Sequence, residues 1–432
     1  AGAAGLAAAR RLDQAGISHM VIEARNRVGG RIHSCEGAEL GAEFIHDEPE
    51  GLLALAREAG VEPYELADRH LLWKGGRLVE IPDFWGKLIA SLDALDPDHE
   101  PDRPVAEALA EGVSDPEWRE LARSYIEGFH AADPRLAGER EIARAEREEG
   151  ADRKVFRIRE GYSSVLEPLM PGSTGRGLLL LSSRLLKLRW RAGSVEAILA
   201  REVEPHYSRI ETAHANAAIV TFPLGVLQAS ARKLPGNPRF DPELPSTVRT
   251  ALSQLRMGTV LKVVFRFTEA FWESDPRMRE LGFVHAPELA FPTWWGTRPE
   301  PSPKLVAWLG GPEANRLSVT KDPIAIQRLA LSSLEAWSGV SRNDIRDRLS
   351  AWYFHDWRRD PLSLGAYAYA GVGSEGAAET LAEPVEDTMF FAGEAVNPGG
   401  ATGTVDAAIA SGEAAAARAI ETIAKGGGQE AA

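Results

Sequence analysis

The pattern of hydrophobic positions predicts helices and strands from the first residues of the chain onward. Residues 6–12 are rich in alanine and leucine and have strong helix propensity. We expect Gly16 to end this helix, because glycine readily adopts the left-handed conformation that follows a helix C-terminus. Residues 18–22 then predict a short strand, which ends at Glu23.

Residues 261–267 alternate between two faces with the period of a strand. The face that we expect in the core comprises Leu261, Val263, Phe265 and Phe267. Lys262 shares the other face with Val264 and Arg266. A lysine in this position has an ordinary interpretation, which is an edge-strand side chain that extends to solvent.

Longer segments have weaker but readable patterns. Two further β segments are expected around 178–190 and 210–222. Residues 76–150 have a helical pattern interrupted by Asp-Pro pairs. Within that segment the charged run 139–149 is interpreted as the solvated face of a helix.

Length and charge exclude several classes of protein. At about 150 residues per domain, 432 residues suggest two or three domains. The net charge is −14 and no dense Lys/Arg run occurs, which argues against a nucleic-acid partner. The single cysteine, Cys35, excludes a disulfide within the chain and a cysteine-built metal site, and no metal site is predicted. No apolar run reaches the roughly 20 residues that a membrane span needs, so no membrane partner is expected.

The first residues carry the first candidate chemistry. Gly2 and Gly5 open the predicted helix, and Glu23 follows the strand about 20 residues later, as in the later part of a dinucleotide-binding βαβ unit. Glycines let a pyrophosphate approach the helix N-terminus, and the acid accepts hydrogen bonds from ribose hydroxyls. The full pattern has an earlier glycine and strand, so we expect the chain to be N-terminally truncated by roughly ten residues. Taken alone, the glycine pair also fits an ordinary alanine-rich helix.

Residues 23–31, Glu-Ala-Arg-Asn-Arg-Val-Gly-Gly-Arg, continue directly from this acid. They resemble the E-A-R-x-R-x-G-G-R segment of flavin-dependent amine oxidases, the family that includes monoamine oxidase, polyamine oxidase and the lysine-specific histone demethylases. The resemblance implies that this loop wraps the FAD pyrophosphate and ribityl chain. Arg25, Gly29, Gly30 and Arg31 are then expected at the cofactor.

Four more segments resemble the family in order along the chain: 39–46, 217–227, 390–395 and 403–412. The resemblance implies an α/β (α+β) two-domain fold, with a Rossmann-like FAD-binding domain interleaved with a substrate domain of mixed sheet plus helices. It also implies further cofactor contacts from Gly41, Ala42, Glu43, Leu185, Trp357, Gly393, Glu394, Thr404 and Val405.

The interleaving divides the chain into discontinuous domains. The FAD-binding domain is expected to comprise residues 1–72, 152–240 and 384–425. The substrate-binding domain is expected to comprise residues 73–151 and 241–383. Residues 426–432 are expected to form a flexible tail.

The resemblance also implies catalytic residues. Lys262 matches the lysine that holds a water beside flavin N5, where a buried amine is able to organise the reaction of reduced flavin with oxygen. Trp357 opens a segment, 357–369, similar to the family's W-x-x-D-P-x-x-x-G-x-Y-x-Y motif. Tyr367 would form one aromatic wall of the amine cage, whereas Tyr369 is adequately explained as a core residue. Thr404 occupies the place of the second aromatic wall in monoamine oxidases, so the cage is half aromatic, as in polyamine oxidases and demethylases.

The cofactor is expected to be FAD, held noncovalently. Monoamine oxidases attach flavin to a cysteine in the late part of the chain, and Cys35 lies far from that region. Retention then rests on the pyrophosphate loop, Glu23, Arg31, Glu394 and the helix that begins near Thr404, whose dipole favours the negative charge of reduced flavin.

The substrate is expected to be an amine without an α-carboxylate. Amino-acid oxidases of this superfamily bind the carboxylate through an arginine in the segment that reads 41–46 here, and this segment has none. His46 resembles the active-site histidine of some polyamine oxidases, although an ordinary loop histidine explains it equally well. Glu43 and the acids at 47, 48 and 50 make the neighbourhood acidic, which suits a cationic amine.

We therefore predict oxidation of an amine to an imine and aldehyde, with O2 reduced to hydrogen peroxide. Two alternatives stay open: a desaturase or porphyrinogen-type oxidase on the same fold, and a catalytically impaired FAD-fold binding protein. The expected partners are a small-molecule amine and O2. The oligomeric state stays open, a homodimer included. A cytoplasmic location is the default, with an export signal ahead of residue 1 as the open alternative.

Overall fold

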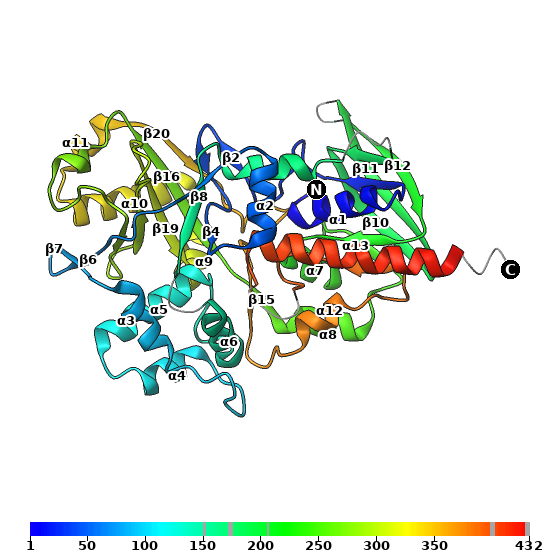
Figure 1. Cartoon of the computed structure of the whole chain (residues 1–432), viewed down its shortest axis with the longest axis horizontal. Helices are drawn as coiled ribbons and strands as arrows, with labels where there is room; N and C mark the ends of the chain where they lie inside the picture. Colours follow the sequence, from blue (N-terminus) through cyan, green and yellow to red (C-terminus); the bar gives the residue numbers. More distant parts are fainter. Residues whose placement is uncertain (150–152, 172–175, 205–206, 398–401, 428–432) are drawn as a thin grey trace.

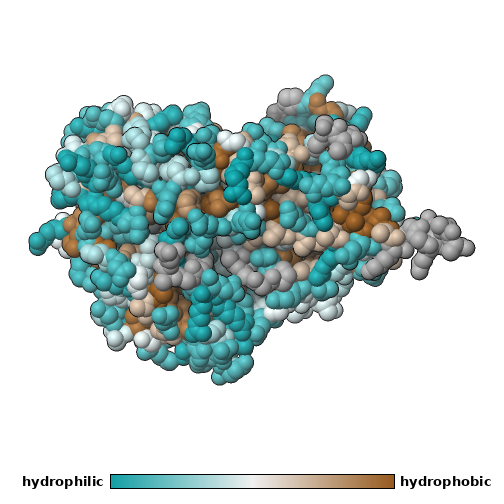
Figure 2. Space-filling model, in the orientation of Figure 1, coloured by the Kyte–Doolittle hydropathy of each residue, from teal (hydrophilic) through white to brown (hydrophobic). Residues whose placement is uncertain are grey.

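The computed structural model describes residues 1–149, 153–171, 176–204, 207–397 and 402–427. Figure 1 shows α1, α13 and the β10–β12 sheet on the right and a large sheet with α10 and α11 on the left. Helices α3 to α6 lie below the large sheet. The face of the molecule in Figure 2 is mostly hydrophilic, with hydrophobic colour confined to smaller areas.

The parallel strands form two pairs beside two packed helices. The predicted first helix is α1 (Ala3–Gln14), and Gly16 follows it with a φ of 71°, which confirms it at the helix end. Strand β1 (His19–Ile22) pairs in parallel with β9 (Gly177–Leu180). Strands β13 (Ala218–Val220) and β22 (Met389–Phe391) form the second parallel pair.

Helix α13 (Val405–Gly427) packs against α1 through a close crossing. A Cβ placed on Gly412 would lie 2.2 Å from the carbonyl oxygen of Ala4, so only glycine allows this approach. Because α13 continues to Gly427, the prediction of a flexible tail is wrong for residues 426 and 427. The rest of that predicted tail lies outside the described residues.

An antiparallel meander covers the parallel pairs. Strands β10 (Ser183–Arg191), β11 (Ser194–Glu204) and β12 (Tyr207–Ala215) pair in sequence, and β14 (Arg239–Asp241) joins β10 in parallel. The predicted segments 178–190 and 210–222 are each divided by a break in the structure. Strand β11 was missed, although its buried positions alternate in its first half.

A seven-stranded sheet forms the other half of the molecule, in the order β20-β16-β19-β18-β17-β6-β7. Its strands are β20 (Leu349–Phe354), β16 (Val260–Phe267), β19 (Lys304–Gly310), β18 (Thr293–Trp295), β17 (Phe283–His285), β6 (His70–Lys74) and β7 (Arg77–Glu80). The predicted core face of 261–267 is confirmed, because all four residues are buried. The covering helices are α9 (Gly311–Thr320), α10 (Pro323–Ser338) and α11 (Arg342–Arg348). The predicted domain boundary at residue 72 falls inside β6, and the division into two domains stays a prediction.

Residues 84–149 form a group of four helices, which we call the helical lobe. They are α3 (Phe84–Leu92), α4 (Val105–Gly112), α5 (Pro116–Phe129) and α6 (Glu139–Glu149). The interpretation of 139–149 as a solvated face is wrong in part. Glu139 is fully buried and pairs with Arg103 at 2.5 Å, and Glu146 is buried beside His130. The charges are therefore used inside the lobe as well as on its surface.

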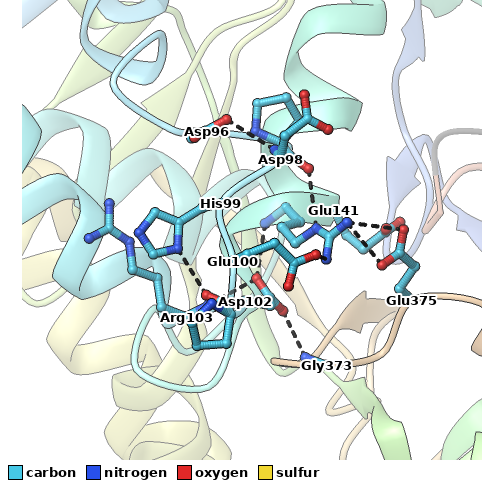
Figure 3. Close-up of polar contacts among 12 residues, drawn as sticks. Asp96, Asp98, His99, Glu100, Asp102, Arg103, Glu141, Gly373 and Glu375 are labelled. Carbon is cyan, nitrogen blue, oxygen red and sulfur yellow. Dashed lines mark hydrogen bonds and ion pairs between the residues drawn. The ribbon is translucent and has the colours of Figure 1, made fainter.

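A polar network joins the lobe to the segment after β21 (Ala368–Ala370) (Figure 3). Asp102 accepts hydrogen bonds from the backbone N–H of Gly373 at 2.7 Å and of Arg140 at 3.2 Å. Arg140 also forms ion pairs with Glu100 and Glu375. Because β21 follows directly on Tyr367, this network fixes the lobe relative to a predicted site residue.

The remaining elements are short connections around these parts. They are β2 (Ser34–Cys35), β3 (Ala38–Glu39), β4 (Ile45–His46), α2 (Glu50–Glu58), β5 (Pro63–Glu65), β8 (Val155–Ile158), η1 (Tyr162–Leu169), α7 (Leu224–Ala231), α8 (Ser246–Gln254), β15 (Leu255–Met257), η2 (Phe271–Ser274) and α12 (Ala377–Ala382). Among the described residues, no helix is both long and apolar enough to cross a lipid bilayer.

Candidate active site

One cavity of about 480 Å³ runs from the parallel strands, past the seven-stranded sheet, to the helical lobe. Every residue that the sequence predicted for the site lines it, although the predicted roles stay predictions. These residues are Gly2, Gly5, Glu23, Arg25, Gly29, Gly30, Arg31, Gly41, Ala42, Glu43, His46, Leu185, Lys262, Trp357, Tyr367, Gly393, Glu394, Thr404 and Val405.

Two glycine segments meet at one end of the cavity. Gly2 forms a parallel bridge with Gly29, whose N–H donates to the carbonyl of Ala1 at 2.8 Å. Gly29 and Gly30 have φ values of 99° and 58°, a region that side chains rarely adopt. A Cβ on Gly30 would lie 3.3 Å from the Cα of Gly2. The backbone at the N-terminus of α1 is therefore free of side chains on this wall, which suits an approaching pyrophosphate.

Gly41 is required by the same packing. A Cβ placed there would lie 1.7 Å from the carbonyl oxygen of Arg31 and 3.2 Å from the ring of Trp357. Trp357 is buried, and its indole N–H donates to the carbonyl of Leu40 at 2.7 Å. Ala42 donates its N–H to Arg31 and packs beside these residues. The segment 40–42 is thus clamped between the glycine loop and an aromatic ring.

Two acid–arginine pairs border this end of the cavity. Glu23 accepts from the N–H of Arg25 at 2.8 Å. Arg25 forms an ion pair with Asp360 at 2.9 Å. Burial alone would raise the pKa of Asp360, but His355, Arg25 and a backbone N–H outweigh burial and hold this pKa well below its usual value.

Arg31 and Glu394 form the second pair, at 2.8 Å. Arg31 also donates to the carbonyl of Ala366, and Glu394 accepts from the N–H of Ala368. Both ends of this pair therefore hold the strand segment that carries Tyr367. The Arg31 guanidinium, which is predicted to bind phosphate, is therefore held in place by the segment that is predicted to form the amine cage.

The start of α13 and two flanking residues complete this half. Thr404 caps the helix, because its hydroxyl accepts from the N–H of Ala407 at 3.2 Å, and Val405 is the first helical residue. Gly393 exchanges hydrogen bonds with the hydroxyl of Ser411. Leu185 is partly buried in the core under the meander and reaches the cavity from β10.

Lys262 lies in the cavity wall and is buried, with 4% of its surface exposed. The structure contradicts its interpretation as an edge-strand side chain extending to solvent, because β16 lies between β20 and β19. The Lys262 ammonium lies 2.6 Å from Glu43 and donates to the carbonyl of Gly41 at 2.9 Å. Lys262 therefore lies beside Gly41, where the two halves of the cavity meet.

Glu43 does not supply free negative charge to the acidic neighbourhood predicted for a cationic amine, although Asp47 of that neighbourhood lines the cavity. The buried carboxylate of Glu43 already pairs with Lys262 and with Arg157, each at 2.6 Å, and accepts from the Trp295 indole at 3.0 Å. Burial alone would raise the pKa of Glu43, but Arg157 and Lys262 outweigh burial and lower it. The cluster holds two cations and one anion, so it carries no spare negative charge for a substrate.

Tyr367 presents its ring to the cavity, and its hydroxyl contacts the carbonyls of Phe129 at 2.7 Å and Gly128 at 3.1 Å. Burial, with Glu394 nearby, raises the pKa of this phenol, which stays neutral. Tyr369 is buried in the core of the helical lobe, as its core interpretation expected.

His46 is neutral in this environment. Burial first, and the charge of Arg153 second, lower its pKa to about 4. Its ring contacts Phe44 and Phe129, with centroids 6.2 Å and 5.1 Å away. The imidazole is therefore a hydrogen-bonding group within an aromatic part of the cavity.

Sequence reasoning missed most of the cavity on the side of the helical lobe. The aromatic residues that line the cavity here are Phe44, Phe84, Trp85, Tyr125, Phe129, Phe283, Trp295 and Trp308. Polar groups that were missed are Arg157 beside Glu43, Arg153 paired with buried Glu146, and the histidines His70 and His285. The alternation around 283–285 and 293–295 is the signal that would have placed the strand residues among them.

The residues at the glycine end fit FAD. The side-chain-free wall at Gly2 and Gly30, the helix N-terminus and Glu23 match the needs of a pyrophosphate and a ribose. The cavity then continues to a buried lysine and an aromatic wall, which is the space that a flavin ring and a small substrate need. Fold and site together define a flavin-dependent oxidoreductase.

The chain belongs to the family of flavin-containing amine oxidoreductases, whose sequence profile matches residues 3–420. It is 29% identical to polyamine oxidase 3 of Oryza sativa subsp. japonica, over 96% of this chain and 87% of that protein. It is 27% identical to the probable polyamine oxidase 4 of Arabidopsis thaliana, over 92% of this chain and 81% of that protein. It is 24% identical to human lysine-specific histone demethylase 2, of which it spans half.

Solved structures agree on the fold. Putrescine oxidase bound to putrescine superposes with a TM-score of 0.76 at 19% identity, over 97% of both chains. Cyclohexylamine oxidase from Brevibacterium oxydans IH-35A gives a TM-score of 0.76 at 20% identity, over 98% of both chains. The predicted family, the α/β fold class, the FAD cofactor and the amine-oxidising activity are confirmed, and the two alternative functions are not favoured.

Proposed function

We propose that the chain oxidises an amine with a largely apolar body and no α-carboxylate, and that O2 is the electron acceptor. The observation that carries this proposal is buried Lys262, held by Glu43 and Gly41 where the glycine half of the cavity meets the aromatic half. The imine product would hydrolyse to an aldehyde, and the reduced oxygen would leave as hydrogen peroxide.

The cavity charges favour an apolar substrate over a polycation. Three acids that line the cavity, Glu43, Glu141 and Glu394, are engaged in ion pairs with arginine. A polyamine would need free carboxylates along its length, and these three are already paired. The aromatic lining instead offers apolar contact area and ring faces for a single ammonium group.

The chain's own residues bind and orient the amine. The Tyr367 ring is held by its hydroxyl and by the Arg31–Glu394 pair, so that its face forms a fixed wall. Neutral His46 is able to accept a hydrogen bond from the substrate nitrogen. Thr404 offers no aromatic ring to the amine cage, and its hydroxyl caps α13.

FAD would be held by the glycine wall, Glu23, Arg25, Arg31, Glu394 and the N-terminus of α13, and when bound it supplies the redox chemistry. Cys35, the only cysteine, is not among the cavity-lining residues. This supports noncovalent attachment. We also propose that the chain divides into an FAD-binding and a substrate-binding domain. A cytoplasmic location is the default, and the number of subunits stays open.

The experiment uses purified protein reconstituted with FAD and a panel of alkyl- and arylalkylamines. Anaerobic addition of a substrate should bleach the flavin absorbance, and air should restore it with peroxide release. Lys262→Met should retain FAD and bleach with the amine, yet return to the oxidised spectrum at least tenfold more slowly, because the cavity loses its buried lysine cation. Lys321→Met changes an exposed lysine and is the control. Unchanged reoxidation in Lys262→Met would remove the role of this lysine, and no bleaching with any amine would remove the function.

A further inference from the structure

A second cavity, of about 440 Å³, lies between α7, α8, β15 and the start of α9. Among the described residues, it shares only Tyr369 with the cavity of the candidate active site. Helices α7 and α8 and strand β15 pack together below α13 in Figure 1. The Gln228 amide on α7 fixes this packing, because it donates to the carbonyls of Leu252 at 2.8 Å and Leu255 at 2.9 Å, at the C-terminal end of α8. The cavity is therefore built by elements that are joined to one another.

Three arginines reach this cavity from different elements. Arg249 lies on α8, and the residues three and four positions after it also line the cavity, which is the spacing of one helix face. Arg232 follows the last residue of α7 and lies about one turn after Gln228. Arg256 is opposite Tyr369 in the β15–β21 ladder, so the two side chains share one face. The periodicity of three separate elements thus brings guanidinium groups to one space.

The lining of this cavity is positively charged, although the whole chain has a net charge of −14. Against the three guanidinium groups the described lining has one carboxylate, that of Asp133, which already forms an ion pair with another arginine. Arg249 is paired with Glu243 at 2.9 Å. The side chains of Arg232 and Arg256 have neither an ion pair nor a hydrogen bond within the described part of the chain. Two guanidinium groups are therefore available to a ligand.

The size and the remaining lining of the cavity favour a small organic molecule over a bare inorganic ion. Its volume lies in the range of about 300–1,000 Å³ that is typical of small-molecule sites. Leu136, Met257 and the Tyr369 ring supply apolar surface beside the arginines. Both Arg232 and Arg256 are exposed, so a ligand is able to reach them from solvent. A guanidinium presents a planar fork that matches the oxygens of a carboxylate or a phosphate.

We propose that the second cavity binds a small organic dianion, whose charge is shared between Arg232 and Arg256 and whose body lies on the apolar part of the lining. Two unpaired guanidinium groups call for two negative charges, and a dicarboxylate and a phosphate ester both supply them. The site goes beyond the proposed function, because its ligand contacts neither the space assigned to FAD nor the space assigned to the amine.

The test is calorimetric titration of the FAD-loaded protein, in which the glycine wall of the first cavity is occupied and does not take up the probe. The probes are phenyl phosphate and 1,3-benzenedicarboxylate, both dianions at about pH 8, with benzoate as the monoanion and benzyl alcohol as the neutral control. At least one dianion should bind with a Kd below about 1 mM, and benzoate should bind at least about tenfold more weakly. Tighter binding of phenyl phosphate assigns a phosphate ester to the site, and the reverse order assigns a dicarboxylate.

Variants of the two unpaired arginines locate the binding. Arg232→Gln and Arg256→Gln should each weaken the preferred dianion at least about tenfold, because each removes charge-assisted hydrogen bonds. Arg232→Lys retains the charge without the planar fork and should keep part of the affinity. Arg328→Gln changes an exposed arginine on α10, away from the cavity, and should change nothing. All four variants should fold and oxidise the amine as the native protein does.

Three results would overturn the inference while the proposed function stands. One is the absence of measurable binding of either dianion. Another is full affinity in Arg232→Gln or in Arg256→Gln. The third is binding of benzyl alcohol as tight as that of the dianions, which would show that charge does not matter. If the native protein oxidises no amine, the proposed function fails, and the titrations still decide whether the second cavity binds a dianion.

Discussion

Replacing Glu43 with glutamine removes one buried negative charge with almost no change of shape. In the native protein this carboxylate balances Lys262 and Arg157, and the three side chains are 3%, 4% and 10% exposed. Glu43→Gln leaves two cations uncompensated in the protein interior. Breaking a buried ion pair from one side costs about 3–5 kcal/mol, so we expect a loss of that size in the free energy of unfolding.

A double-mutant cycle separates the charge effect from packing. Lys262→Met alone leaves Glu43 paired with Arg157 and should cost less than Glu43→Gln. In the double variant only one cation is left, so its total loss should be smaller than the sum of the two by about 1–3 kcal/mol. Urea unfolding followed by tryptophan fluorescence measures all four proteins.

The same carboxylate predicts a pH dependence. The pKa of Glu43 is lowered in the folded protein, so its stabilisation is full above the ordinary glutamate pKa and is lost as the pH falls through the folded value. Between neutral pH and about pH 3, the stability difference between the native protein and Glu43→Gln should therefore stay constant at first and shrink once the pH falls below the ordinary glutamate pKa of about 4.3. Additive losses in the cycle, or a difference that stays constant over this pH range, would refute the reasoning.

Three further predictions concern single positions. Gly41→Ala should abolish FAD retention or folding, because its Cβ would overlap the Arg31 carbonyl, and Gly51→Ala, with open space around it, should leave flavin absorbance intact. Thr404→Ala should lower the unfolding free energy by about 1 kcal/mol through loss of the helix cap, measurable by urea titration, whereas Thr404→Ser should cost less. Asp102→Ala should cost about 1–3 kcal/mol in the same titration, because it leaves backbone N–H groups without their acceptor.

Local patterns predicted the parts of the site that a short segment determines by itself. Gly29 and Gly30 act through positive-φ backbone conformation, which is encoded where they stand. The alternation at 261–267 placed Lys262 on the face opposite the core, and the structure has it there. The alternation of side chains between the two faces of a strand is a local property, so it can be read from the sequence of that strand alone.

Partners far apart in the chain were not predictable in this way. Lys262 contacts Gly41 across 221 positions, and His70 meets His285 across 215. The acidity at Glu43 was visible, but its neutralisation by Arg157 depends on how β8 folds back to the sheet. For the same reason the charged run at 139–149 was expected to be solvated, since nothing local shows that Arg103 reaches buried Glu139.

Substitutions on one face of the seven-stranded sheet have different consequences from substitutions on the other face. In β17, β18 and β19, the residues Val284, Trp294 and Ala307 are buried on the face beneath the covering helices. The cavity is lined from the other face by Phe283, His285, Thr293, Trp295 and Trp308. Substitutions at cavity-lining positions outside the buried cluster of Val264, Trp295 and Val306, such as Thr293, therefore reshape the substrate space and leave the interior packing of the sheet in place. A lineage with this sheet is able to change its amine preference gradually, through single exchanges at cavity-facing positions, without first acquiring compensating changes in the core.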